Sequence, residues 1–308
     1  MDAASISRQG LLLRIVRFAP TRMALLYVSM TYLYLAGFFF RSGFTHGPLQ
    51  NVAASAMSCV MMLVLYACIV HYTEHRPATE LALHGPAGRE LGVGILLGFG
   101  LYTLCILLLM LLGNYRIDGV GDWSILLAGM AAPMATGVFE ELLFRGGVFR
   151  LAEEWFGTWA ALVISSLVFG FVHYGAEGVT LQGLISISTW AGLLLAATYL
   201  LTRRLWLGIG LHAAWNYTQG AVYSGIVSGN APPEGFLKSS LQGSEWLTGG
   251  SFGVEASVVA LVVCSSVGVF MLVKAVRRGH ILPPPWKRRF VDQGDGTIRC
   301  MRGGDHVG

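Results

Sequence analysis

Charged residues are scarce in this chain. Only 12% of its 308 residues are charged and 54% are hydrophobic, whereas soluble domains carry about 25% charged residues. The mean hydropathy is +0.61. These values exclude an ordinary soluble globular domain and indicate a polytopic membrane protein. The net charge of +4 is small, and nothing in the composition points to a nucleic-acid partner.

Cysteine is also scarce, with five residues in the whole chain. Four of them fall in apolar stretches, and Cys300 lies in the C-terminal segment. There is no CxxC pair and no thiol spacing typical of a metal site. The sequence therefore predicts neither a disulfide framework nor a thiolate metal centre.

Long runs of apolar residues make up most of the sequence. Each is close to the ~20 residues that a helix needs to cross the hydrocarbon, and such continuous runs favour helices over barrel strands, whose apolar residues alternate. We therefore predict an all-α bundle of about eight transmembrane helices. The predicted spans are Met23–Phe40, Val52–Val70, Leu91–Gly113, Trp123–Phe144, Trp159–Tyr174, Leu184–Leu201, Leu205–Ile226 and Ala256–Val273.

Three regions follow from this pattern. Residues 1–22 form a basic, amphipathic segment expected to lie along the inner leaflet. Residues 23–282 form the bundle, and residues 283–308 form a Pro/Gly-rich basic tail expected to be flexible and cytoplasmic. Residues 229–253 form a long outer loop, interpreted as a connector or a lid.

Basic residues predict the orientation. With the N-terminus inside, 18 of the 21 Lys and Arg residues fall in inner segments, and only Arg41, Arg116 and Lys238 fall outside. The positive-inside rule therefore predicts that both termini are cytoplasmic. The pairs Glu153-Glu154 and Arg203-Arg204 are expected to anchor helix ends at the membrane interface.

Four strongly polar side chains fall at similar depth within the predicted spans. At ~1.5 Å per residue, Glu140 lies about 15 Å, His173 about 21 Å, His212 about 12 Å and Asn216 about 18 Å from the inner boundary. The hydrocarbon is ~30 Å thick, so the four cluster near its midplane. Ionisable residues at that depth are functional candidates. One such histidine alone would more often make an interhelical hydrogen bond, but the shared depth favours a site.

Local spacing separates the two adjacent acids. Glu141 and Arg145 are four residues apart, with the acid N-terminal, which favours an ion pair on one helix face. Glu140 projects about 100° away, so we expect Glu141 to act as a structural clamp and Glu140 to face a cavity. Pro133 is expected to loosen the helix around the carbonyl of Gly129.

Three motifs carry a resemblance to a known family. Glu140-Glu141-Leu-Leu-Phe-Arg145 resembles the EExxxR motif of the CPBP intramembrane proteases, which process CAAX proteins and bacteriocins. Phe169-Gly-Phe-Val-His173 resembles the family's FxxxH motif, and His212-Ala-Ala-Trp-Asn216 its HxxxN motif. The motifs occur in family order over residues of about 130–225.

The resemblance implies an eight-helix endopeptidase with a cavity open to the cytoplasmic side. It implies that Glu140 is the general base, that His173 helps to polarise the water, and that His212 and Asn216 stabilise the oxyanion. Glu141 and Arg145 would support the site. No cofactor is required in this interpretation. The alternative is a zinc site made by Glu140, His173, His212 and Asn216, although the HExxH motif of the zincins is absent.

Two other functions remain open from the sequence. Membrane Glu and His residues also form proton relays, so a proton-coupled transporter is one alternative, although no inverted repeat is visible. A non-catalytic immunity or scaffold protein is the other. For a protease, we expect a membrane-associated protein or peptide substrate, contact with the lipid bilayer, and a place in a bacterial inner membrane.

Overall fold

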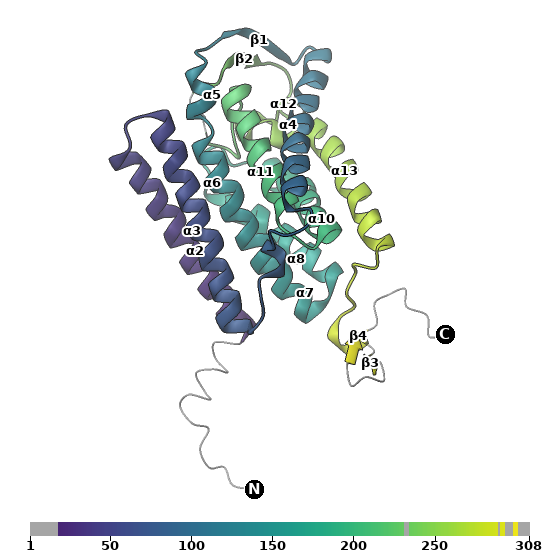
Figure 1. Ribbon diagram of the computed structural model, residues 1–308. Helices are drawn as coiled ribbons and strands as arrows, with labels where there is room; N and C mark the ends of the chain where they lie inside the picture. The colour runs from purple at the N-terminus through teal and green to yellow at the C-terminus, as the bar shows by residue number, and fades with distance from the viewer. Residues whose placement is uncertain (1–17, 231–233, 289, 293–297, 301–308) are drawn as a thin grey trace.

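The all-α membrane fold predicted from the sequence is present. The computed structural model describes residues 18–230, 234–288, 290–292 and 298–300, and these form a helical bundle with two short antiparallel sheets (Figure 1). Within these residues, seven helical segments are long and apolar enough to cross a membrane. They are Ala19–Phe44 (α2), Pro48–Glu74 (α3), Ala87–Leu111 (α4), Ser124–Phe156, Thr158–Gly175, Leu181–Thr202 and Val258–Arg277 (α13).

Three of these segments change helix type along their length. The first consists of α5 (Ser124–Ala128), α6 (Ala131–Glu140), the π-helix η2 (Glu141–Phe149) and α7 (Arg150–Phe156). The second consists of α8 (Thr158–Phe171) and the 3-10 turn η3 (Val172–Gly175). The third consists of α9 (Leu181–Ser186), the π-helix η4 (Ile187–Ala191) and α10 (Gly192–Thr202).

The predicted span Leu205–Ile226 differs from the others. It forms α11 (Trp206–Tyr217) and a short π-helix, η5 (Thr218–Val222). Nine of the twelve residues of α11 are buried, so this helix lies in the interior of the bundle. The expectation of eight comparable spans is therefore corrected to seven long apolar helices and one shorter, buried helix.

Glycines allow α11 to pack closely against α4. A Cβ atom at Gly98 would lie 2.3 Å from the carbonyl oxygen of Leu211, and one at Gly94 would lie 2.3 Å from that of Leu207. Backbones can approach this closely only where small residues line the contact. The α4–α11 contact therefore fixes the helix that carries two of the candidate site residues.

A two-stranded sheet lies at one end of the bundle, the upper end in Figure 1. Strand β1 (Tyr115–Val120) pairs antiparallel with β2 (Leu237–Leu241), which belongs to the predicted outer loop. The loop continues through α12 (Glu245–Thr248) and the 3-10 turns η6 (Gly250–Phe252) and η7 (Val254–Ala256). Apart from residues 231–233, which lie outside the described residues, this segment is packed structure. We call this end of the molecule the sheet end.

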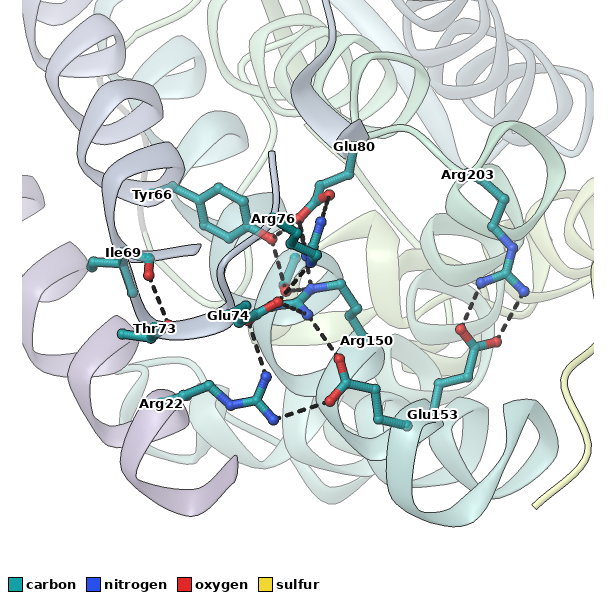
Figure 2. A network of polar contacts seen from close by, with 12 residues as sticks. Arg22, Tyr66, Ile69, Thr73, Glu74, Arg76, Glu80, Arg150, Glu153 and Arg203 are labelled. Carbon is teal, nitrogen blue, oxygen red and sulfur yellow. Dashed lines mark hydrogen bonds and ion pairs between the residues drawn. The ribbon is translucent and has the colours of Figure 1, made fainter. Parts of the chain in front are cut away.

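The opposite end is held by buried ion pairs (Figure 2), and we call it the ion-paired end. Arg150 on α7 lies 2.6 Å from a carboxylate oxygen of Glu74 on α3, 3.1 Å from Glu154 and 3.6 Å from Glu80. Arg22 on α2 bridges Glu74 and Glu154 at 3.2 and 3.0 Å. The network therefore ties α2, α3 and α7 together with the 3-10 turn η1 (Thr79–Leu81), which carries Glu80.

Glu80 is ionised within this network. Burial alone would raise the pKa of its carboxyl group, but the hydrogen bonds from Arg76, the charge of Arg150 and the hydrogen bond from Tyr66 outweigh burial and lower the pKa below its ordinary value of 4.5. A buried carboxylate with several charged donors remains charged.

The acidic and arginine pairs predicted to anchor helix ends at the membrane interface also make ion pairs between helices. Arg203 donates to both carboxylate oxygens of the buried Glu153 at 2.6 and 3.1 Å, and Arg204 lies 3.1 Å from Glu90 on α4. The sequence alone does not show that these charges meet across helices.

The structure describes parts of both predicted terminal segments. Helix α2 begins at Ala19, with Pro20 in its first turn, so residues 19–22 belong to this helix, while residues 1–17 lie outside the described residues. Residues 283–288 were expected to be flexible, but Arg288 donates to the carbonyl oxygens of Glu153 and Glu154. After a 3-10 turn, η8 (Pro285–Lys287), the strands β3 (Phe290–Asp292) and β4 (Ile298–Cys300) form a second sheet.

Candidate active site

The helix that carries the two acids is interrupted within the fourth predicted span. Helix α5 ends at Ala128 and α6 begins at Ala131, so the interruption falls around Gly129, where Pro133 was predicted to loosen the helix. Pro133 has no backbone N–H to donate to the carbonyl four residues earlier. Helix α6 then ends at Glu140, and a π-helix begins at Glu141. Such π-helical turns are frequent at functional sites.

Glu141 and Arg145 form the ion pair predicted from their spacing. Arg145 Nη1 donates to Glu141 Oε1 at 3.0 Å, and both side chains are fully buried. Arg145 also donates to the carbonyl oxygen of Ala191 at 3.2 Å and lies 4.6 Å from the ring centroid of Phe169. Gly208 leaves room for the acid, because a Cβ atom there would lie 2.9 Å from Glu141 Oε2.

Glu141 has a second partner that the sequence did not reveal. His212 Nδ1 lies 3.0 Å from Glu141 Oε1 and donates to it, since a carboxylate can only accept. The other ring nitrogen, Nε2, lies 3.7 Å from Glu140 Oε2. The two adjacent acids therefore lie at opposite nitrogens of one imidazole ring. Glu141 orients that ring as well as pairing with Arg145.

Glu140 differs from its neighbour in its surroundings. Its side chain retains 15% of its exposure and lines a cavity. Its Oε2 atom is buried without a hydrogen-bond partner among the described residues. The Oε2 atom of the carboxylate therefore lies close to His212, while other parts of the side chain line the cavity.

His173 enters the site from the end of α8. It lies in the 3-10 turn η3, and its Nδ1 is 2.7 Å from the carbonyl oxygen of Phe169. A carbonyl oxygen can only accept, so Nδ1 carries a proton and donates it to this bond. In the neutral ring, Nε2 is then the unprotonated nitrogen and is able to accept a hydrogen bond.

One cavity of about 760 Å³ brings the four predicted residues together. Glu140, His173, His212 and Asn216 all line it. His212 and Asn216 are 7% and 8% exposed, and both lie on α11. The structure brings the four predicted side chains to one cavity, while their assignment as site residues and their chemical roles stay a prediction.

Helix α2 supplies a wall of the cavity that the motifs do not include. Tyr34 lines the cavity, its hydroxyl lies 2.9 Å from the hydroxyl of Thr136, and its ring stacks on Phe139 at 4.5 Å. Tyr34 therefore packs beside the residue that directly precedes Glu140. A tyrosine in an apolar span gives no sequence signal for this position.

Another buried acid near the cavity, Glu255 in η7, accepts hydrogen bonds from residues at its far wall. Its Oε2 accepts from the backbone N–H and the hydroxyl of Ser228, which lines the cavity, at 2.7 and 2.9 Å. Its Oε1 accepts from Trp215, the neighbour of Asn216, at 3.1 Å. Burial raises the pKa of the Glu255 carboxyl group, although the bonds from Ser228 oppose the shift. The only sequence signal was an isolated acid at the start of an apolar run.

The cavity lies between the site and the sheet end. Beyond Glu140 its walls include Ile125 and Gly129 at the start of the fourth span, Gly220 at the end of the seventh, and Asn230 and Glu234 in the outer loop. The ion-paired end lies in the opposite direction along the bundle (Figure 1).

Among the described residues, no three His, Cys, Asp or Glu side chains are placed to share one ion. The Nδ1 atoms of His212 and His173 contact Glu141 and a carbonyl oxygen, so only their Nε2 atoms could serve as metal ligands. A zinc ligand set would require donors about 2.0–2.2 Å from one centre.

Comparison with known proteins supports the same region. Residues 122–218 match the family model of the type II CAAX prenyl endopeptidase Rce1-like proteins. Searches for similar curated proteins and for similar solved structures found no match. The matched segment runs from the residues before α5 to the end of α11, and it contains all three motifs. The family predicted from the motifs is confirmed at the level of this match, because residues 122–218 match the Rce1-like family model of type II CAAX prenyl endopeptidases.

Proposed function

We propose that this protein is an intramembrane endopeptidase that hydrolyses a peptide bond of a membrane-associated protein or peptide with a water activated by Glu140. At family level, the match over residues 122–218 supports a CAAX-type endopeptidase. The observation that carries the finer proposal is the convergence of Glu140, His173, His212 and Asn216 on one cavity. We place the protein in a bacterial inner membrane.

The proposed reaction begins at Glu140. Its carboxylate takes a proton from the water while the water oxygen attacks the carbonyl carbon of the scissile bond. His173 Nε2 accepts the second hydrogen of the water and so helps to orient it. The protonated Glu140 then returns its proton to the departing amide nitrogen, and the C–N bond breaks. A positioned base of this kind contributes about 10²–10⁴-fold to the rate.

The developing oxyanion is stabilised by α11. Asn216 supplies its side-chain amide, and His212 supplies Nε2–H in its protonated form, because Nδ1–H already donates to Glu141. A protonated His212 together with Arg145 balances the two negative charges of Glu140 and Glu141. Donors held in place before the reaction lower the barrier more than mobile ones.

Glu140→Gln tests the proposal. We expect about 10²–10⁴-fold slower hydrolysis with unchanged folded yield, because Glu140 Oε2 makes no hydrogen bond that the substitution would break. Hydrolysis is measured by comparing the new peptide N-termini in membranes from cells that express wild type or variant. Glu177→Gln, which changes an exposed carboxylate near His173, is the matched control. Undiminished processing in the Glu140 variant would leave a scaffold or transporter as the better function.

Metal dependence is tested separately. Elemental analysis of the purified protein is combined with assays after exhaustive chelation and after zinc is returned. The proposal expects activity to survive chelation. Stoichiometric zinc whose removal abolishes hydrolysis and whose return restores it would contradict the glutamate-water mechanism.

A further inference from the structure

We propose that Glu255 is a positioning residue of the active site, which sets where Asn216 lies relative to His173. Glu255 does not itself line the cavity, so it acts through the residues that bond to it. The inference rests on the proposed function. It extends the site beyond residues 122–218, because Glu255 lies outside the segment that matches the family model.

One oxygen of the Glu255 side chain is bonded to α11. Glu255 is 3% exposed, and its Oε1 accepts a hydrogen bond from Trp215 Nε1 at 3.1 Å. Trp215 directly precedes Asn216 on α11, and its ring packs on Trp190 with 4.7 Å between ring centroids. Trp190 Nε1 in turn donates to the backbone carbonyl oxygen of Glu255 at 2.8 Å. A single residue therefore holds both indole rings, and with them the part of α11 that carries Asn216.

The other oxygen of the side chain shapes the cavity wall at Ser228. Glu255 Oε2 accepts from the backbone N–H and from the hydroxyl of Ser228 at 2.7 and 2.9 Å. Ser228 lines the cavity and has a φ of +48°, in the left-handed region that residues other than glycine rarely adopt. Such conformations persist where surrounding contacts enforce them, and they cluster at functional sites. The two bonds to Glu255 are the contacts that hold Ser228 in this conformation.

The same loop holds the chain that leaves the His173 turn. After η3 the chain reaches Gly178, whose N–H donates to the carbonyl oxygen of Gly229 at 2.9 Å. Gly229 donates its own N–H to the carbonyl oxygen of Phe252 at 3.0 Å. The segment just before Glu255 therefore holds the His173 side of the cavity, while the carboxylate of Glu255 holds the α11 side.

A carboxylate suits this position because three donors converge on it. The indole of Trp215 and the two groups of Ser228 all donate, and a carboxylate accepts at both of its oxygens. A glutamine has only one acceptor oxygen and would present an NH₂ group to one of these partners. Glu255→Gln therefore breaks one arm of the contact while it preserves the size of the side chain.

Glu255→Gln tests the proposal. We expect hydrolysis per folded molecule to fall by about 10–10²-fold, because a small misplacement of Asn216 relative to His173 removes much of the rate. Hydrolysis is measured as new peptide N-termini in membranes and is divided by the amount of protein that is folded in detergent. Glu245→Gln, an exposed carboxylate in α12 of the same loop, is the matched control and should keep full activity. A lower folded yield with unchanged hydrolysis per folded molecule would overturn the proposal.

A kinetic split separates positioning from folding. A quenched fluorescent peptide that spans a cleavage site found in the membranes serves as the substrate. Because Asn216 is proposed to stabilise a charge that forms only in the transition state, Glu255→Gln should lower kcat and leave KM unchanged. In an Asn216→Ala background it should have little further effect, since the group that it positions is gone. An equal loss of kcat in both backgrounds would overturn the proposal.

Two further variants keep the proposal testable if Glu255→Gln does not fold. Trp215→Phe removes the indole N–H and keeps an aromatic ring, and Ser228→Ala removes one donor to Oε2. A lowered kcat in either folded variant would support the proposal, and full kcat in both would overturn it. Glu140→Gln is assayed beside them. If that variant cleaves as fast as wild type, the proposed function fails, whereas loss in it alone removes only the role of Glu255.

Discussion

The two ends of this bundle use the same kinds of side chain for opposite purposes. At the ion-paired end, the side chains of Glu74 and Glu80 are only 6% and 3% exposed, and Arg150 and its neighbours satisfy them. Toward the sheet end, Glu140 faces a cavity with one carboxylate oxygen that has no hydrogen-bond partner among the described residues. The comparison teaches that a buried acid surrounded by arginines supports the fold, whereas an acid that lines a cavity is placed to meet a substrate.

Removing Arg150 should have the largest effect on stability. Arg150→Ala leaves Glu74, Glu80 and Glu154 without a shared cation, and breaking a buried ion pair costs about 3–5 kcal/mol. We expect a lower folded yield and a lower thermal unfolding temperature in detergent. Arg116→Ala is the control, because Arg116 is 78% exposed in its pair with Asp118 and its loss should leave the unfolding temperature unchanged. Equal stability of the two variants would remove the distinction between the ends.

A change in the packing between α4 and α11 should have the second-largest effect on stability. Gly98→Ala puts a methyl group 2.3 Å from the carbonyl oxygen of Leu211, and overpacking of this kind costs about 1–3 kcal/mol. We expect a lower unfolding temperature together with slower hydrolysis, because α11 carries His212 and Asn216. Gly100→Ala on the same helix meets no atom within 4 Å and should be neutral or stabilising by up to ~1 kcal/mol. A stable, fully active Gly98 variant would show that this contact does not position the site.

The pH dependence of stability should show the smallest effect. The pKa of Glu80 is lowered in the folded protein, so its contribution to the free energy of unfolding is complete above the ordinary pKa of 4.5 and is lost as the pH falls through the lowered folded value. The stability difference between wild type and Glu80→Gln should therefore shrink as the pH falls below 4.5. It is measured from unfolding temperatures over a series of pH values. A difference that grows on acidification would mean that Glu80 is not held as a carboxylate.

Residue spacing predicted much of the site because its motifs are local. Glu141 and Arg145 lie one helical turn apart, and so do His212 and Asn216, so a periodic pattern reveals them. The contact between Glu141 and His212 joins residues 71 positions apart. Its presence depends on how α6, η2 and α11 pack, which no local spacing encodes.

The dependence on tertiary packing also explains the other differences between the sequence-based predictions and the structure. Apolar runs predicted the spans because burial in lipid requires about 20 consecutive apolar residues. They did not separate α11 from the lipid-facing helices, because a helix buried in protein is as apolar as one buried in lipid. The bonds from Ser228 and Trp215 to Glu255 and the pair of Arg203 with Glu153 join distant segments, so the sequence showed only isolated charges.

The π-helix that follows Glu140 has a consequence for how this chain can vary. A π turn contains more residues than the α turn it replaces, and η2 extends from Glu141 to Phe149 between the two acids and α7. Loss of one residue there would let the π turn close as an α turn, which leaves the rotation of α7 nearly unchanged but moves the residues within η2 to other faces of the helix. Arg145 is one of those residues. The extra residue therefore decides which faces η2 presents to the bundle, and the helices on either side of it keep their orientation.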